Sequence, residues 1–140
     1  MIAHFVNPSL AEIRALLQRT RTVAVVGLSP SPGRASHGVA RALQGFGLRV
    51  VPVNPSVPEV LGEKAYPSLR DLPWPVDLVD VFRDPRHVAG IVEDCMALKL
   101  PALWLQDGVV DEVAALRARA AGLTVVMDRC LYRDYIQLMR

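Results

Sequence analysis

Residues 27–36 combine side chains and spacing that suit one kind of chemistry, the binding of a phosphate. They read Gly-Leu-Ser-Pro-Ser-Pro-Gly-Arg-Ala-Ser and directly follow a short apolar run. Small residues let the backbone approach a ligand closely, and the N–H groups at a helix start attract anions. The spacing Gly27-x-Ser29-x-x-x-Gly33 is neither the GxGxxG dinucleotide pattern nor a P-loop, because no Gly-Lys-Ser/Thr follows. We expect a phosphate-binding turn with contacts from Gly27, Ser29 and Ser36; the alternative is a capped strand–helix turn without a ligand.

The charge around this loop has one sign. Between Glu12 and Glu59 the chain holds no acidic residue. A cationic segment of this kind favours a polyanionic ligand. Arg34 lies inside the loop and is the residue we expect to contact phosphate, whereas the arginines near the N-terminus are equally explained as a solvated helix surface. The basic residues of the segment are Arg14, Arg19, Arg21, Arg34, Arg41 and Arg49.

The end of the second apolar run argues against one common ligand. Folds that bind NAD place an Asp or Glu at this point to hold the ribose hydroxyls. Here the run ends at Asn54-Pro55. An ordinary NAD-dependent dehydrogenase is therefore disfavoured.

Catalytic and metal-binding groups are sparse. The three histidines are far apart in sequence and show no metal-ligand spacing. His37, at a helix start, is equally suited to phosphate contact and to a surface or capping role. Asp77, Asp80 and Asp84 surround one apolar run and suggest magnesium, but strand alternation places Asp77 and Asp84 away from a common point, so we interpret them as structural. We expect no catalytic residue and no metal site.

Three of four other side chains have both a chemical and a structural interpretation. Cys130 follows the last expected strand and is a candidate reactive thiol, although a buried inert thiol is the commoner outcome. Cys95 has the pattern of a core residue. Phe82 and Trp104 lie near strand ends, where they would flank a purine or simply pack in the core.

Hydrophobic patterning predicts the elements that must position these residues. A leading helix over residues 1–21 begins at Asn7-Pro8-Ser9, and a later helix begins at Asp84-Pro85. The proline-rich stretch 54–76 reads as loop with one short edge strand near Ala65-Tyr66. A short helix is expected in the tail at 128–140. Continuous apolar runs predict buried parallel strands at 23–26, 48–53, 76–82, 100–105 and 123–127, with helical spacing between them.

Alternation of strands and helices predicts an α/β fold, a Rossmann-like doubly wound parallel sheet of five to six strands with helices on both faces. We expect the strand order 3-2-1-4-5 and a single domain over residues 1–140. Ligands of such sheets bind beyond the carboxyl ends of the strands, at the switch point in strand order. Most of the expected strand ends carry polar side chains that suit hydrogen bonding.

Composition limits the class of protein to which the chain can belong. The chain has 140 residues, 51% of them hydrophobic and 21% charged, which is typical of a soluble globular domain. A net charge of +2 is far below that of most nucleic-acid-binding domains. We expect no membrane segment, no signal peptide and, with two cysteines that form no framework, reduced thiols in the cytoplasm.

The chain also resembles a known family. Six blocks in order, VAVVGLSPSPGRASHGVARAL, VVPVNP, LGEKAYPSL, VDLVDVFR, LWLQDGV and VVMDRC, are similar to the small stand-alone coenzyme A-binding proteins. Those proteins are in turn similar to the N-terminal domain of the succinyl-coenzyme A synthetase α subunit. The likeness runs from about Leu10 to Tyr135, and together the blocks are specific.

The resemblance implies coenzyme A, or an acyl derivative, bound across the strand ends. Gly27, Ser29 and Ser36 would then form the pyrophosphate loop. On electrostatic grounds we add Arg34 or Arg41 as the partner of the ribose 3′-phosphate. The remaining implied positions are Val53, Asn54 and Pro55 beside the nucleotide, and Phe82, Arg83, Gln106 and Gly108 along the groove.

Two departures from the family limit what the resemblance implies. The synthetase subunit continues into a domain with a phosphorylated histidine, which this sequence lacks, so thioester synthesis is not expected as its own activity. Asp107 stands where relatives often have an apolar residue. The sequence therefore favours a non-catalytic carrier, sensor or regulator that binds coenzyme A. The alternatives are a docking subunit for a separate acyl-coenzyme A ligase and a thiol redox protein that uses Cys130.

Overall fold

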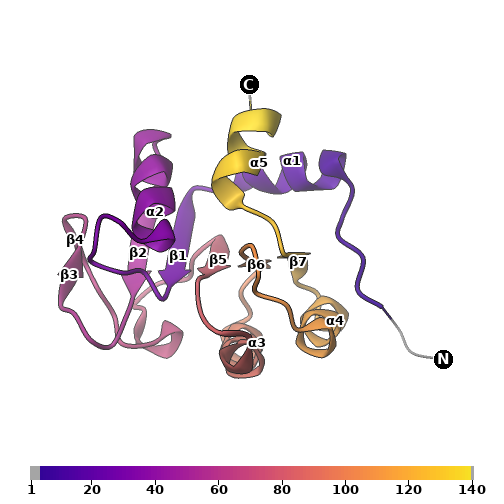
Figure 1. Ribbon diagram of the computed structural model, residues 1–140. Helices are drawn as coiled ribbons and strands as arrows, with labels where there is room; N and C mark the ends of the chain where they lie inside the picture. Colours follow the sequence, from indigo (N-terminus) through magenta and orange to yellow (C-terminus); the bar gives the residue numbers. More distant parts are fainter. Residues whose placement is uncertain (1–3, 140) are drawn as a thin grey trace.

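The computed structural model describes residues 4–139 of the chain. Within them, five parallel strands form one sheet in the order β2-β1-β5-β6-β7, and β3 and β4 form a separate antiparallel pair (Figure 1). This confirms the α/β fold with a doubly wound parallel sheet. The strands span β1 Thr22–Val26, β2 Arg49–Val53, β3 Glu59–Val60, β4 Glu63–Lys64, β5 Leu78–Val81, β6 Ala102–Leu105 and β7 Thr124–Met127.

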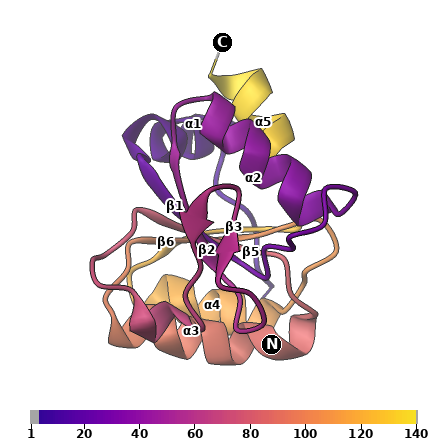
Figure 2. The ribbon, with the colours of Figure 1, turned by 90° about the vertical axis from the view of Figure 1, so that its left-hand side faces the viewer.

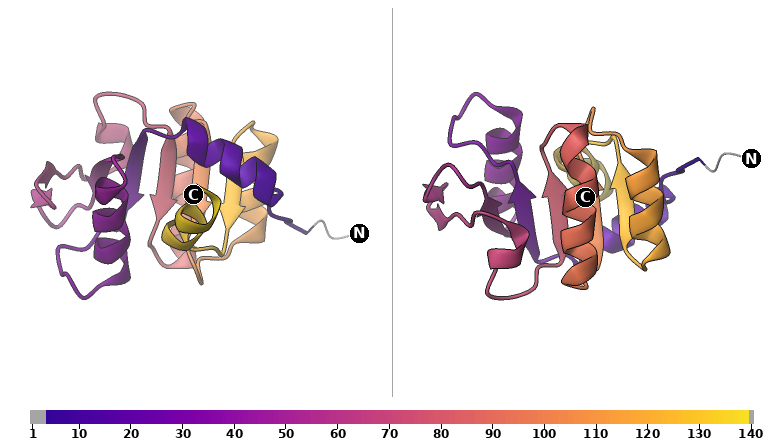
Figure 3. Two further views of the ribbon diagram at one scale, coloured as in Figure 1. Left: turned by 90° about the horizontal axis from the view of Figure 1, so that it is seen from above. Right: turned by 90° about the horizontal axis from the view of Figure 1, so that it is seen from below.

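Helices cover both faces of the sheet, as the sequence predicts. Figures 2 and 3 show α1, α2 and α5 over one face and α3 and α4 over the other. The α-helices span α1 Leu10–Arg19, α2 Ala35–Gly45, α3 Val88–Ala97, α4 Glu112–Ala120 and α5 Leu131–Leu138, and two short 3-10 turns are η1 Leu69–Asp71 and η2 Pro85–His87.

The expected strand order depends on whether the edge segment near Ala65-Tyr66 is counted. Tyr66 forms an isolated parallel bridge with Val53 on the outer side of β2. With this segment as the third strand, the observed order is 3-2-1-4-5-6, which contains the expected one. Over the five strands of the sheet itself it is 2-1-3-4-5, so the strong strand predicted at 76–82 lies beside β1 and not outside β2.

Pro52 explains why β2 tolerates only this partial pairing on its outer side. Proline has no N–H to donate, so it is confined to strands at a sheet edge. The carbonyl of Pro52 accepts from the N–H of Tyr66 (3.0 Å), and the N–H of Asn54 donates to the carbonyl of Tyr66 (2.9 Å). The stretch 54–76 thus returns to the sheet near the carboxyl end of β2.

Each face of the sheet has its own hydrophobic core. Strand alternation divides β5 between them: Val79 and Val81 pack under α3 and α4, whereas Leu78 packs under α1, α2 and α5. Trp104 of β6 is fully buried in the second core, so it cannot flank a ligand, and core packing is its role. Cys95 is buried on α3, where burial and the neighbouring Asp94 raise the pKa of its thiol to about 12, so it stays protonated and inert.

Helix starts follow the predicted caps. Ser9 and Glu12 form the capping box of α1, each side chain accepting from the other residue's N–H at 3.2 Å. Asp84 caps η2 by accepting from the N–H of Arg86, and this turn leads into α3. Asp77 accepts from the N–H groups of residues 21 and 22 at the base of β1. Asp77 and Asp84 are therefore structural, as expected.

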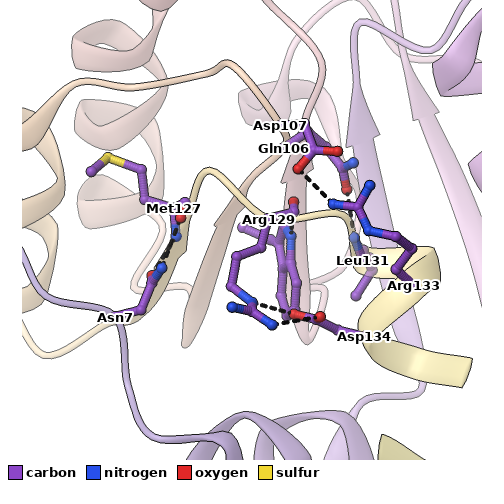
Figure 4. Close-up of polar contacts among 9 residues, drawn as sticks. Asn7, Gln106, Asp107, Met127, Arg129, Leu131, Arg133 and Asp134 are labelled. Carbon is purple, nitrogen blue, oxygen red and sulfur yellow. Dashed lines mark hydrogen bonds and ion pairs between the residues drawn. The ribbon is translucent and has the colours of Figure 1, made fainter. Parts of the chain in front are cut away.

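The segment before α1 protects the outer edge of β7. The side-chain amide of Asn7 donates to the carbonyl of Met127 (2.9 Å) and accepts from its N–H (2.8 Å) (Figure 4). Asn7 thus supplies both bonds of a missing neighbouring strand, which protects an edge that otherwise invites pairing with another chain. None of the helices in residues 4–139 is both long and apolar enough to cross a membrane.

Candidate functional site

The switch point of the sheet lies between β1 and β5. From β1 the chain passes over one face through α2 to β2, and from β5 it passes over the opposite face through α3 to β6. The loops that leave these two neighbouring strands diverge, and in this fold class ligands bind between them. The loops are residues 27–34 and 82–87.

Gly27 lies where these loops come closest. Its φ is +85°, and a Cβ added there would lie 2.3 Å from the carbonyl oxygen of Phe82. Its N–H donates to the carbonyl of Val53 (2.9 Å), and the N–H of Phe82 donates to the carbonyl of Val26 (2.9 Å). Glycine is required because both the conformation and the space exclude a side chain. The ends of β1, β2 and β5 are therefore joined at this residue.

The side chains of Ser29 and Ser36 mainly stabilise the conformation of the loop. The N–H of Ser29 donates to the hydroxyl oxygen of Ser36 (3.0 Å), and the N–H of Ser31 donates to the hydroxyl oxygen of Ser29 (3.1 Å). Ser36 is buried on the first turn of α2. The serines thereby shape the loop so that it presents the start of α2 to the crevice.

The start of α2 is open and cationic. Arg34 is its N-cap residue, and within residues 4–139 its side chain makes neither a capping hydrogen bond nor an ion pair. The first turn of the helix holds no acidic residue. The first N–H groups of a helix without a side-chain cap form an anion site, and a free guanidinium beside them strengthens it.

Asn54 bridges two strand ends. Its side-chain amide donates to the carbonyl of Leu28 (2.9 Å), and its side-chain oxygen accepts from the N–H of Ser56 (2.8 Å). Pro55 is exposed beside it. Asn54 is therefore committed to positioning the loop, and an acidic ribose ligand of the NAD type is absent from this strand end.

A pocket of about 380 Å³ lies at the carboxyl ends of β1 and β2, on the face covered by α3. Its lining combines apolar side chains with a few polar and charged ones, which is the usual composition of a ligand pocket. Arg83 and His87 line it one helical turn apart, with Arg83 Nη2 2.9 Å from His87 Nε2. A guanidinium only donates, so His87 Nε2 accepts, and the ring proton is assigned to Nδ1. The lining comprises Val26, Val53, Pro67, Ser68, Leu69, Arg83, His87, Gly90, Ile91 and Asp94.

Sequence reasoning found some of these residues and missed others. It named Val53 and Arg83, and the structure brings both to the pocket near Gly27 and Phe82. It missed Pro67 to Leu69, because the local sequence of a proline-rich stretch does not indicate that the stretch returns to the sheet and lines a pocket there. It considered His87 only as one of three histidines that are far apart in sequence and show no metal-ligand spacing, although the spacing of four from Arg83 was a usable signal.

Gln106 and Gly108 lie on the loop after β6, where they form hydrogen bonds to the segment that leads from β7 into α5. The buried side chain of Gln106 accepts from the N–H of Leu131 (3.1 Å), and the N–H of Gly108 donates to Asp128 Oδ1 (2.8 Å). Figure 4 shows this loop bound to the start of α5. These two residues are not among those that line the 380 Å³ pocket, and their contact with a ligand remains a prediction.

Ion pairs fix the same corner. Arg129 contacts both carboxylate oxygens of Asp134 (2.6 and 2.8 Å), and Arg133 pairs with Asp107 (2.9 Å) (Figure 4). Cys130, the N-cap residue of α5, is half-buried and is a free thiol. Among the described residues, no cluster of three or more His, Cys, Asp or Glu side chains is placed to hold a metal ion.

Comparison with known proteins gives a consistent result. A family model described as "CoA binding domain" matches residues 21–135. The protein YneT of Bacillus subtilis is 44% identical over 125 residues, which cover 89% of this chain and 93% of YneT. An ADP-forming acetate–CoA ligase of Archaeoglobus fulgidus is 36% identical over 75 residues, which cover 54% of this chain and only 11% of the ligase. The solved structure of a hypothetical protein from Pyrococcus horikoshii matches with a TM-score of 0.92 at 33% identity, covering 99% of this chain and 100% of that one.

Proposed function

The chain belongs to the CoA binding domain family, and from this premise we propose that it binds coenzyme A or an acyl-coenzyme A at the carboxyl ends of β1, β2 and β5. The observation that supports this proposal most is that two suitable binding features lie at the same crevice. A cationic, uncapped helix start lies on one side of Gly27, and a pocket lined by apolar side chains and Arg83 lies on the other. Coenzyme A has two parts that match these two features: three phosphates suit the helix start, and the adenosine that carries them suits the pocket.

The proposed binding mode assigns the phosphates to the α2 side. The backbone from Gly27 to Ser29 and the first turn of α2 at Ser36 receive the pyrophosphate. Arg34 meets the ribose 3′-phosphate, because its guanidinium is exposed and has no acidic partner in the described part of the chain.

The adenosine occupies the 380 Å³ pocket. Val53 supplies an apolar wall, and the guanidinium of Arg83 stacks on the base or donates to it. Asn54 and Pro55 border the ribose at the end of β2. Phe82, Gln106 and Gly108 line the path along which the pantetheine arm leaves toward β6.

The role that fits this site is binding without chemistry, as a carrier, sensor or regulatory module. A second candidate is a docking subunit of a separate acyl-coenzyme A ligase, favoured by the 36% identity to an acetate–CoA ligase of which this chain spans 11%. Co-purification with a purified ligase partner that requires coenzyme A would support docking. A titration curve that the partner leaves unchanged would support the carrier or sensor role.

Calorimetric titration with coenzyme A, dephospho-coenzyme A, NAD and ATP tests the proposal. We expect saturable binding of coenzyme A and weaker binding of the other three, because they lack the 3′-phosphate or the pantetheine arm. Failure of coenzyme A to bind at millimolar concentration, or a preference for NAD, would overturn the proposal.

Two arginine variants separate the two halves of the proposed site. Arg34→Ala is expected to weaken coenzyme A about tenfold while leaving dephospho-coenzyme A nearly unchanged, since one charge-assisted phosphate contact contributes about 1.4 kcal/mol. Arg83→Ala is expected to weaken both ligands equally, because both contain the adenosine. Equal losses for both ligands in Arg34→Ala would exclude it as the partner of the 3′-phosphate.

A further inference from the structure

Asp80 occupies an unusual position in the centre of the sheet. It is the third residue of β5, in register with Val25 of β1 and Trp104 of β6. Alternation along β5 turns it toward the core under α1, α2 and α5, which contains Val25, Leu78 and Trp104. The side chain is fully buried, and among residues 4–139 neither carboxyl oxygen has a hydrogen-bond partner.

A carboxyl in such a place is stable only as a neutral acid. Ionisation would leave a charge in an apolar layer without a compensating donor, which is more costly than an unpaired neutral group. Burial accordingly raises the pKa of Asp80 well above its ordinary value.

The neighbouring strands and α1 offer Asp80 no compensating charge. β1 and β6 contain no ionisable side chain over Thr22–Val26 and Ala102–Leu105. On α1 the charged side chains are all exposed; they are Glu12, Arg14 and Arg19.

The other two helices over this face offer none either. On α2, Arg41 is exposed and His37 is half-buried; on α5, Tyr132 and Arg133 are exposed. Asp134 is buried but held by Arg129, and the ring of Tyr135 stacks on Phe46 with centroids 4.5 Å apart. None of these groups forms an ion pair or hydrogen bond with Asp80 in the described part of the chain.

The position of Asp80 connects it to the crevice. Two residues after Asp80, just beyond the end of β5, the carbonyl of Phe82 packs on Gly27, and two residues before Gly27 lies Val25, the register partner of Asp80. The helix that covers this core and begins at the ligand loop is α2. Opening of this core to water beneath α2 would therefore disturb the helix on which the proposed ligand site depends.

We propose that Asp80 couples ligand binding to a proton: the layer of α2 and α5 is closed over a neutral Asp80 and loosens when Asp80 gives up its proton to water. The inference rests on the proposed function, because its functional consequence is that coenzyme A binds the closed, protonated form. Affinity then falls as pH rises through the pKa of Asp80, by up to tenfold per pH unit for one proton.

The first test needs no coenzyme A. The chain has two tryptophans, so in a Trp74→Phe background Trp104 alone reports on the core beside Asp80. We expect its emission to shift reversibly to longer wavelength as pH rises from 5.5 to 9.5. The shift should vanish in Asp80→Asn and in Asp80→Leu, the second variant serving if the first does not fold. A shift that persists in a folded Asp80 variant, or its absence from the parent, would overturn the proposed opening.

The second test measures coenzyme A affinity over the same pH range. The phosphates of the ligand titrate in every variant, so the difference between wild type and Asp80→Asn isolates the protein's proton. We expect affinity to fall with pH more steeply in wild type, and Asp77→Asn, a carboxylate change at the base of the same strand, to keep the wild-type slope. Identical slopes in wild type and Asp80→Asn would overturn the coupling. Absence of coenzyme A binding at every pH, with the Trp104 shift retained, would overturn the proposed function and leave the proton-dependent opening standing.

Discussion

Gly27→Ala is expected to abolish high-affinity coenzyme A binding and to destabilise the fold by about 2–5 kcal/mol. The left-handed backbone costs a residue with a Cβ about 1–2 kcal/mol. The methyl group would also lie 2.3 Å from the carbonyl oxygen of Phe82, and overpacking of this kind costs about 1–3 kcal/mol more. Because the obstacle is backbone, relief requires β1 and β5 to separate at their carboxyl ends. Urea unfolding and calorimetric titration would measure the two effects.

Gly47→Ala is the matched control. Gly47 has a similar φ of +92°, but in the described structure no atom other than those of its two chain neighbours lies within 4 Å of the position its Cβ would take. We expect this variant to lose only the conformational cost of about 1–2 kcal/mol and to bind coenzyme A like wild type. Equal stability losses at the two positions would show that the contact with Phe82 does not constrain Gly27.

Asp80→Leu is expected to stabilise the protein at neutral pH by about 2 kcal/mol or more. The substitution replaces an unpaired buried carboxyl by an apolar side chain of similar size, which removes the desolvation cost of a polar group. A functional site often retains a residue that the core would otherwise exclude, so a gain in stability here would accompany the loss of proton coupling.

The pH dependence of this gain has a definite sign. The folded state raises the pKa of Asp80, so folded protein holds the proton more tightly than unfolded protein. The contribution of Asp80 to stability is therefore most favourable below the ordinary Asp pKa of 3.8 and declines as pH rises toward the folded pKa. Unfolding in urea at pH 4 and pH 8 should show a small advantage of Asp80→Leu at pH 4 and a larger one at pH 8. An advantage of equal size at both pH values would mean that Asp80 does not change its protonation between folded and unfolded protein.

Several parts of the fold follow from local sequence. Continuous apolar runs such as Val23 to Val26 belong in strands buried on both sides, and that is where the structure has them. Ser9 with Glu12, and Asp84 before Pro85, cap their helices through contacts within a few residues. These predictions succeed because each depends on interactions between near neighbours in the chain.

The proposed site also has one part that local sequence predicts and another that only tertiary structure shows. Gly27, Arg34 and the start of α2 were visible in the sequence because a strand, a small-residue loop and a helix follow one another directly. Tertiary structure added the pocket beside Arg83, since its wall at Ser68 comes from a proline-rich stretch whose position depends on contacts with distant residues, among them the pairing of Tyr66 with β2.

The sequence by itself determined the fold class, the cationic loop, the absence of an acid at Asn54 and the resemblance to coenzyme A-binding proteins, all of which are written in contiguous runs of residues. Tertiary structure decided where β5 lies in the sheet. It also decided which polar side chains already form hydrogen bonds within the protein, as Gln106 does, and which have no hydrogen-bond partner. The reason is that pairing and burial depend on residues distant in the chain. Asp80 shows this most clearly: the sequence presents it as one of three acids near the apolar run 76–82 that suggest magnesium, and only the packing of α1, α2 and α5 makes it a buried acid.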